Sequence, residues 1–300
     1  MKYLIFGGTG LVGKKLAEYI VTQGDEVKTV SRSGNDESIA LDIREEEEFN
    51  KLDFYPDVII NCASQIPVNG RTSQDPFFLR DLFETNVVGA VNIANWAVRN
   101  KISKIINCST LVVVKKPWPD FLSETYFGIP DGPHVGYCMS KLCQEQIMSE
   151  CVVNSQTKLL HARISAVYGE EMLPEGLIFN LLQKLENNED IILTDGNKNT
   201  VDLIHVEDVS RSLYALSDTN FELKILNLAS GKQISILNLA FLLKELTGSE
   251  SKIINHSTNV PASTANISVE KLKGLIGDKY NNFIPLEEGL KSVIGQCQWV

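Results

Sequence analysis

The sequence predicts an α/β fold, in which a doubly wound parallel sheet carries helices on both faces and a smaller C-terminal lobe is interleaved with it. Two observations support this prediction. Apolar runs of strand length alternate with segments of helical spacing through the first half of the chain, and a glycine-rich turn joins the first such pair. The second half is less regular and has no clean linker, which favours an interwoven lobe over a separate domain.

The first half repeats a strand-to-helix step. The predicted strands are short apolar runs, at Tyr3–Phe6, Glu26–Val30, Asp57–Ala63, Ser103–Val114 and Lys158–Ile164. The predicted helices have apolar residues every three or four positions, at Leu11–Gln23, Leu79–Arg99 and Tyr137–Val153. Gly24 is placed to end the first of these helices. The acidic run Glu45–Glu48 indicates a solvated helix start, where negative charge suits the helix dipole.

The second half contains fewer clear elements. Its predicted helices are Leu177–Glu186, Val206–Leu216 and Ile234–Thr247, and its predicted strands are Val201–Ile204 and Ile225–Leu228. The segment Asp195–Thr200 is rich in turn residues. We therefore expect a first domain over residues 1–168 and a lobe over residues 169–300, with some segments at about 200–230 returning to the first domain.

Composition excludes several classes of protein. The 300 residues are 43% hydrophobic and 22% charged, and the net charge of -10 gives no attraction to nucleic acid or an anionic membrane. No signal peptide and no apolar run of membrane-spanning length is present, so we expect a cytoplasmic protein. The six cysteines form no CxxC pair and have no histidine at ligand spacing, which predicts buried free thiols and no metal site.

A glycine loop follows the first predicted strand and opens the first predicted helix. Gly7 suits a tight turn, Gly10 lets the backbone approach a pyrophosphate, and Gly13 allows close packing of helix on sheet. Leu11 and Val12 lie at the helix N-terminus, whose free N–H groups attract phosphate. This context predicts a Rossmann-like dinucleotide site in the first domain, which leaves substrate binding to the lobe. The alternative is a glycine-rich turn without a ligand.

The end of the second predicted strand bears on the choice of cofactor. A carboxylate that accepts from the ribose 2′-hydroxyl is usual there in NAD sites, but this chain has Ser31 and Arg32. Arg32 is suited to pair with a 2′-phosphate, which favours NADP(H) over NAD(H). The alternative is that Arg32 is a solvated loop residue that stacks on adenine, with either cofactor accepted.

Tyr137 and Lys141 form a YxxxK pair near the start of a predicted helix. Residues four apart lie on one helical face, and an ammonium close to a phenol lowers the phenol pKa. Such a tyrosine can act as an acid or base near neutral pH. The alternative is a solvent-exposed pair with no chemical role.

Together these motifs resemble the extended short-chain dehydrogenase/reductase family of sugar-nucleotide epimerases, dehydratases and reductases. The resemblance extends over nearly the whole chain, in the same order and spacing. Its segments are FGGTGLVG, Leu41-Asp42-Ile43, Asn61-Cys62-Ala63-Ser64, Glu84-Thr85-Asn86-Val87-Val88-Gly89, Cys108-Ser109-Thr110, GYCMSK, AVYGE, VDLIHVEDV and LNLASG.

The resemblance implies roles for individual residues. Thr110, Tyr137 and Lys141 match the catalytic triad: Thr110 would hydrogen-bond the substrate oxygen, Tyr137 would exchange a proton with it, and Lys141 would hold the nicotinamide ribose and lower the pKa of the tyrosine. The further cofactor contacts that the resemblance implies are Asp42, Ile43, Cys62, Ala63, Ser64 and Thr85. Family members often dimerise through two long helices, which here are Leu79–Arg99 and Tyr137–Val153.

Three positions depart from the family pattern on the substrate side. Val201 replaces an arginine that typically reaches the nucleotide diphosphate, Ala166 replaces an asparagine, and Val260-Pro261 replaces an arginine-proline segment. Neighbouring residues offer compensation, namely Lys198, Lys252 and His256. We expect His205 to be a structural hydrogen-bonding residue, and His134, in the loop before the catalytic helix, to be solvated. The alternative is that His134 touches substrate.

These features predict an NADP(H)-dependent reductase, or epimerase/reductase, of a keto-sugar nucleotide. The missing arginines favour a second hypothesis, a reductase of a small non-nucleotide carbonyl compound. A third hypothesis is an NADP-binding sensor without turnover, although the intact triad argues against it. We expect a homodimer with a small-molecule substrate.

Overall fold

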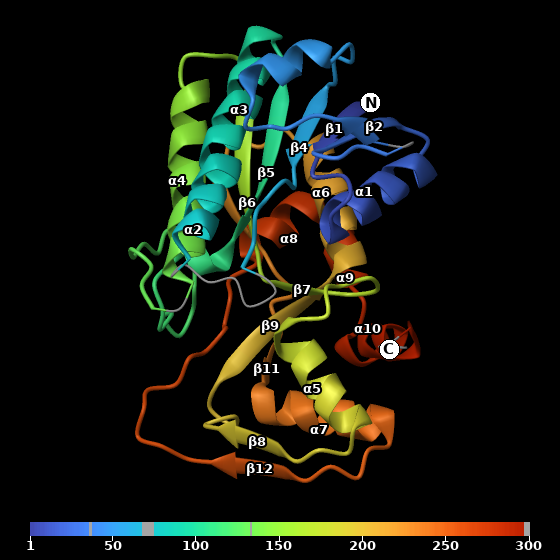
Figure 1. The fold of residues 1–300 in the computed structure, drawn as a ribbon, viewed down its shortest axis with the longest axis vertical. Coiled ribbons are helices and arrows are strands. Elements are labelled where there is room, and N and C mark those ends of the chain that lie inside the picture. The colour runs from blue at the N-terminus through green and yellow to red at the C-terminus, as the bar shows by residue number, and fades with distance from the viewer. Residues whose placement is uncertain (36–37, 68–74, 133, 297–300) are drawn as a thin grey trace.

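The computed structural model describes residues 1–35, 38–67, 75–132 and 134–296. Its centre is a seven-stranded parallel sheet in the order β10-β6-β5-β4-β1-β2-β3. The strands are β1 Lys2–Phe6, β2 Glu26–Ser31, β3 Ser38–Ala40, β4 Val58–Asn61, β5 Lys104–Thr110, β6 Lys158–Ile164 and β10 Ile225–Leu228. Helices cover both faces of the sheet, which confirms the predicted doubly wound parallel fold (Figure 1).

Alternation along the buried strands divides the main core into two layers. In β1, Tyr3 and Ile5 face one cluster, which includes residues of α1 Leu11–Thr22 and α6 Val206–Asp218. Leu4 and Phe6 face the other, which includes residues of α3 Gly89–Arg99 and α4 Val135–Val152. Because successive side chains of a strand point to opposite faces, a strand covered on both sides is apolar at every position.

A smaller body lies beyond the carboxyl ends of the main strands (Figure 1). It contains a three-stranded sheet of β11 Gln233–Ser235, β9 Thr200–His205 and β7 Ala166–Tyr168, and a parallel pair, β8 Ile191–Thr194 with β12 Ile253–His256. Its helices are α5 Gly176–Glu186, α7 Ile236–Thr247 and α10 Leu286–Gln296, whereas α8 Glu270–Ile276 contacts β10 and α9 Asp278–Asn281 follows it. A third apolar cluster fills this body.

In the segment 200–230, α6 packs on α1 and β10 joins the main sheet, but β9 belongs to the smaller sheet. The division at residue 168 stays a prediction.

Several predicted elements differ from the structure in their limits. The predicted helix Leu79–Arg99 consists of α2 Pro76–Phe83, a π-helical turn at Glu84–Val88 and α3. The predicted strand Ser103–Val114 ends at Thr110, because the Thr110 hydroxyl accepts from the Val112 N–H and starts a 3₁₀ turn. The acidic run lies in a 3₁₀ helix, Glu46–Lys51. The strands that the sequence did not predict, β3, β7, β8, β11 and β12, are three or four residues long, too short to show a period.

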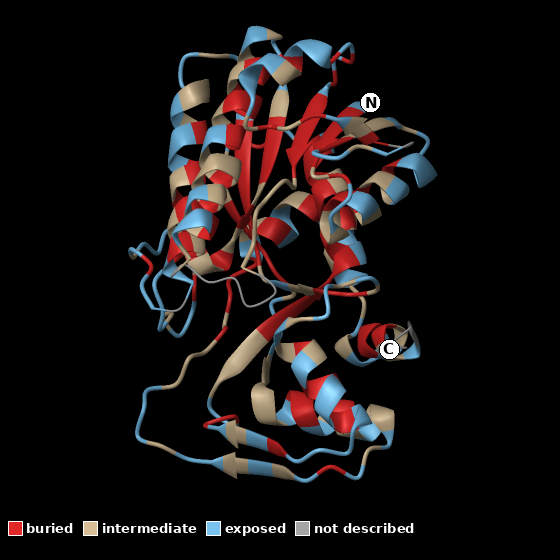
Figure 2. Cartoon of the chain, viewed as in Figure 1, coloured by how far each residue is buried: buried red, intermediate tan, exposed pale blue. Residues whose placement is uncertain are grey.

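Burial corrects the prediction for the cysteines. The buried residues gather on the strands of the main sheet and on the helix faces that pack against it (Figure 2). The five described cysteines are free, but only Cys138 is buried and the other four are half-buried. Cys62 and Cys108 pack against one core cluster and Cys151 against the other, each with part of its surface exposed. Cys297 lies outside the described residues. Within the described chain no helix is long and apolar enough to span a membrane.

Candidate active site

The glycine loop forms the turn from β1 into α1. Gly7 has φ +81°, a conformation that favours glycine, and donates its N–H to the Val30 carbonyl at 2.8 Å. A Cβ on Gly13 would lie 2.2 Å from the Gly7 carbonyl oxygen, so α1 packs closely on the loop. Gly10 is the N-cap of α1 and has no side-chain cap among the described residues. The first N–H groups of α1 therefore remain available to an anion.

A cavity of about 230 Å³ opens beside this loop. It brings together residues from the carboxyl ends of β1, β2 and β4, the place where open α/β sheets bind ligands. Ten of its lining residues were predicted cofactor contacts: Gly7, Gly10, Ser31, Arg32, Asp42, Ile43, Cys62, Ala63, Ser64 and Thr85. Leu11, Val12 and Gly13 lie on α1 and do not line it. Thr9, Arg44 and Gln65 also line it and were not predicted.

Ser31 and Arg32, the two residues that favoured NADP(H) in the sequence, differ in their surroundings. Ser31 is buried, and its hydroxyl accepts from the Gly34 N–H at 3.2 Å and bonds the Ser38 hydroxyl at 3.1 Å, so it is used within the loop. Arg32 is exposed on the cavity wall. Asp42 is held by Arg44, whose Nη2 lies 2.6 Å from Oδ2, and this pairing lowers the pKa of Asp42.

The three predicted catalytic residues come from two neighbouring elements. Thr110 ends β5, and Tyr137 and Lys141 lie one turn apart on α4. Thr110 lines a further cavity of about 150 Å³, whose other side chains include Lys116, Trp118, Ala166, Val201 and Asp202. The Lys116 ammonium lies 4.5 Å from the centre of the Trp118 ring. Neither Lys116 nor Trp118 was predicted, because no motif marks them.

The charge state of Tyr137 differs from the sequence prediction. Burial raises the pKa of its phenol to about 12, and a hydrogen bond with Ser64 acts in the opposite direction. We expected the neighbouring ammonium to lower this pKa, but here burial outweighs any such effect and the pKa lies above the ordinary value of a phenol. The reason is geometric: Lys141 donates to the Cys108 carbonyl at 2.9 Å and to Gln144 Oε1 at 2.5 Å, and neither bond goes to Tyr137. Burial lowers the pKa of Lys141 to about 8.

A buried polar network beneath this site was not predicted. Ser140, Lys141, Gln144 and Glu145 occupy the face of α4 that packs on the sheet, and each is at most 2% exposed. Glu145 forms an ion pair with Arg163 and accepts from the Ser109 hydroxyl at 2.6 Å. The spacing i, i+1, i+4, i+5 was visible in the sequence, but a polar stripe on a helix usually faces water. The stripe is buried here because polar residues on β5 and β6 face it.

The remaining residues singled out in the sequence lie outside these contacts. His205 Nδ1 accepts from the Glu207 N–H at 3.3 Å, and its buried Nε2 has no partner among the described residues. His134 is the exposed N-cap of α4. Of the compensating residues, Lys198 donates to the Thr258 carbonyl at 2.9 Å, and Lys252 and His256 lie at β12. The described residues contain no group of side chains arranged to hold a metal.

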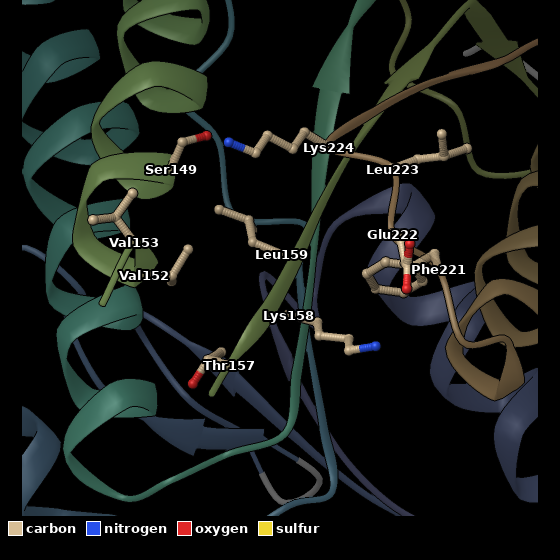
Figure 3. A pocket seen from close by; sticks show the side chains of 10 residues that line it. All are labelled: Ser149, Val152, Val153, Thr157, Lys158, Leu159, Phe221, Glu222, Leu223 and Lys224. Carbon is tan, nitrogen blue, oxygen red and sulfur yellow. The ribbon is translucent and has the colours of Figure 1, made fainter. Parts of the chain in front are cut away.

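A larger cavity, of about 330 Å³, lies at the amino end of β6, away from the glycine loop. Figure 3 shows its side chains, which come from α4, β6 and the segment before β10. It contains no predicted site residue. We therefore place the candidate active site at the glycine loop and the start of α4.

Comparison with known proteins is consistent with this geometry. The model of the NAD dependent epimerase/dehydratase family matches residues 3–229, and the chain belongs to this family of enzymes. It is 25% identical to the UDP-N-acetyl-alpha-D-glucosaminuronate decarboxylase of Bacillus cytotoxicus, over 99% of this chain and 96% of the relative. It is 26% identical to UDP-glucuronic acid decarboxylase 1 of Xenopus tropicalis, over 98% of this chain and 71% of the relative.

Solved structures show the same fold. MoeE5 in complex with UDP-glucose and NAD superposes with a TM-score of 0.80 at 21% identity, over 99% of this chain and 98% of that one. The UDP-glucuronic acid 4-epimerase of Bacillus cereus, in complex with UDP-glucuronic acid and NAD, gives a TM-score of 0.82 at 20% identity over the same shares.

Proposed function

We propose that this enzyme is an NADP(H)-linked reductase, or epimerase/reductase, of a keto-sugar carried on a nucleotide, with NAD(H) as the alternative cofactor. The observation that supports it most is that the glycine-loop cavity and the predicted triad are adjacent: Ser64 lines the cavity and hydrogen-bonds Tyr137, which lies one turn before Lys141 on α4. The relatives named for sugar nucleotides support the substrate class.

The glycine loop fits the pyrophosphate of such a cofactor. A Cβ on Gly10 would stand 3.4 Å from the Gly7 oxygen, so the outer side of the turn is open, and the uncapped N-terminus of α1 supplies N–H donors. When bound, the nicotinamide supplies or accepts the hydride. The loop and the wall formed by Ala63 and Ser64 would hold the cofactor.

The side chains would then move the proton. Thr110 would donate a hydrogen bond to the substrate carbonyl oxygen, and the Tyr137 phenol would give its proton to that oxygen as the carbonyl is reduced. A phenol whose pKa is raised to about 12 is protonated at neutral pH, which suits an acid in the direction of reduction. The Lys141 ammonium would stabilise the phenolate that remains.

The reaction is tested with purified enzyme, NADPH and 4-keto sugars carried on UDP, dTDP, GDP and CDP. We expect NADPH oxidation with at least one of them and its loss in the Tyr137→Phe variant. Absence of oxidation with all four, in a protein that binds NADPH, would overturn the proposal. Conversion without net NADPH oxidation would instead identify an epimerase, dehydratase or decarboxylase.

The preference for NADP(H) rests on Arg32, which lines the cavity and is exposed. Asp42 is already paired with Arg44, so its carboxylate has less capacity to accept from a ribose hydroxyl. Fluorescence titration with NADPH and NADH measures the preference directly. Tighter binding of NADH would replace NADP(H) by NAD(H) and leave the rest of the mechanism unchanged.

One observation favours a second function, reduction of a small non-nucleotide carbonyl compound. The cavity at Thr110 is lined by Val201, Ala265 and Ile267, and Val201 replaces the arginine that we expected to bind a diphosphate. Thermal shift with free UDP, dTDP, GDP and CDP distinguishes the two functions. A rise in Tm with one nucleotide supports the sugar-nucleotide substrate, and no rise with any of them supports the small carbonyl.

We also propose a homodimer through α2, α3 and α4. Phe77, Val88, Ile147 and Val153 are exposed apolar side chains on or beside these helices, which is expected of a face that is covered by a second copy. Light scattering at micromolar concentration tests it, and a monomer would reject it. The cytoplasmic location stays a prediction.

A further inference from the structure

The Gln144 side chain lies one turn beyond Lys141 on α4 and is 1% exposed. Its Oε1 accepts from the Lys141 ammonium at 2.5 Å and from Asn107 Nδ2 at 3.1 Å. Its Nε2 donates to the Asn86 main-chain carbonyl at 2.8 Å. Because that carbonyl can only accept, the amide is fixed with its oxygen toward Lys141.

The network continues to the wall of the cofactor cavity. Asn107 Oδ1 accepts from Asn61 Nδ2 at 2.9 Å, and Asn61 Oδ1 accepts from the Ala63 N–H at 3.2 Å. Ala63 lines the cavity beside the glycine loop. A chain of buried amides therefore joins the cofactor wall to the ammonium, and each link is a hydrogen bond between residues at most 2% exposed, except Ala63 at its end.

A contact with His161 fixes the orientation of the Asn107 side-chain amide. Asn107 Nδ2 lies 3.1 Å from His161 Nδ1, and His161 Nε2 lies 3.0 Å from the Ser149 hydroxyl. Burial lowers the pKa of His161 to about 4, so the ring is neutral and accepts from Asn107 through Nδ1. The second N–H of Asn107 Nδ2 is then directed at Gln144 Oε1, to which it donates.

We propose that Gln144 is a positioning residue that holds the Lys141 ammonium at the active site. Its uncharged amide oxygen, Oε1, stabilises the charged form of Lys141. The proposal rests on the proposed function, in which Lys141 acts on Tyr137 and the cofactor. An ammonium has three donors, and the bonds to Cys108 and Gln144 use two of them. The third donor has no partner among the described residues, so it is available to a ligand.

The neutral amide has a consequence for charge. A carboxylate at this position would cancel the field of the ammonium, whereas an amide oxygen stabilises the charge and leaves the field intact. The Arg163 guanidinium neutralises Glu145, the carboxylate next along α4. The titratable groups around Lys141 are, by element, Tyr137 and Glu145 on α4, Cys62 at the end of β4, Cys108 on β5, and His161 and Arg163 on β6.

Two substitutions at Gln144 separate positioning from packing. Gln144→Met removes the acceptor at similar volume, so the Lys141 pKa should fall by roughly one unit. Gln144→Glu places a carboxylate there, so the pKa should rise by roughly one to three units. We would follow the Lys141 Nζ by ¹⁵N NMR across pH, assigned with Lys141→Met, and measure the pH profile of NADPH-dependent turnover in parallel. The matched controls are Gln146→Met and Gln146→Glu, on the exposed side of the same helix.

Opposite shifts in the two Gln144 variants, with unchanged Gln146 variants, support the proposal. A Lys141 titration that stays at the wild-type pH in folded Gln144→Met and Gln144→Glu proteins overturns it. If one variant does not fold, the sign of the shift in the other decides. The NMR titration needs neither cofactor nor substrate, so a wild-type protein without turnover would overturn the proposed function and not this inference.

Discussion

Gly13→Ala is the substitution with the most direct expected effect on the cofactor site. The added Cβ would lie 2.2 Å from the Gly7 carbonyl oxygen and 2.9 Å from its carbon, both of them main-chain atoms. Contacts of a real Cβ under 3.0 Å essentially never occur, so α1 or the loop must move by roughly one ångström. Overpacking of this kind costs about 1–3 kcal/mol, and the better helix propensity of alanine returns about 0.5–1 kcal/mol.

We therefore expect the free energy of unfolding to fall by up to about 2.5 kcal/mol. The dissociation constant for NADPH or NADH should rise by at least about tenfold, because the displaced turn is the one that we propose faces the pyrophosphate. Urea unfolding and fluorescence titration measure the two effects. The control is Gly274→Ala on α8, where no described atom lies within 4 Å of the added Cβ and a gain of about 0.5–1 kcal/mol is expected. Wild-type stability and cofactor affinity in Gly13→Ala would refute the reasoning.

Three further predictions follow from the site. Arg32→Ser should weaken NADPH binding by about tenfold or more and leave NADH binding unchanged, as measured by fluorescence titration; equal effects on both cofactors would remove Arg32 from 2′-phosphate binding. Tyr137→Phe should lower turnover by about 10²–10⁴-fold with wild-type affinity for the cofactor, and residual turnover near the wild-type rate would exclude Tyr137 as the acid. The pKa of His161 falls from 6.5 to about 4 on folding, so the unfolded chain takes up the proton first as the pH drops. Stability should therefore decrease between pH 6.5 and 4, by up to about 3 kcal/mol, and His161→Gln should flatten this dependence in urea unfolding at each pH.

The sequence predicted most of the strand and helix order of the first half, with the exception of β3, because most elements there are long enough to show their period. β6 has the predicted limits, Lys158–Ile164, and α4 begins two residues before the predicted Tyr137. The short strands of the lobe, β7, β8, β11 and β12, have three or four residues each, too few to show an alternating pattern. Their place depends on which neighbour supplies hydrogen bonds, as when β12 pairs with β8 about sixty residues earlier in the chain.

The candidate site divides in the same way. The glycine loop and the YxxxK pair are local patterns, and a short stretch of chain fixes both their spacing and their chemistry. The state of Lys141 depends on contacts far apart in sequence, such as Gln144 with Asn86 and Asn107 with Asn61. Its pKa and that of Tyr137 follow from burial, which the sequence around them does not specify.

By itself, the sequence determined the family of this protein, its parallel sheet and the residues that we predict to bind a dinucleotide, since these depend on local spacing. Only the tertiary structure decided that the Lys141 ammonium is held by Gln144 and the Cys108 carbonyl, that Asp42 is paired with Arg44, and that burial raises the pKa of the Tyr137 phenol. The physical reason is that hydrogen bonding and desolvation depend on which elements become neighbours, and the strand order β6-β5-β4-β1 places residues from distant parts of the chain around one helix face.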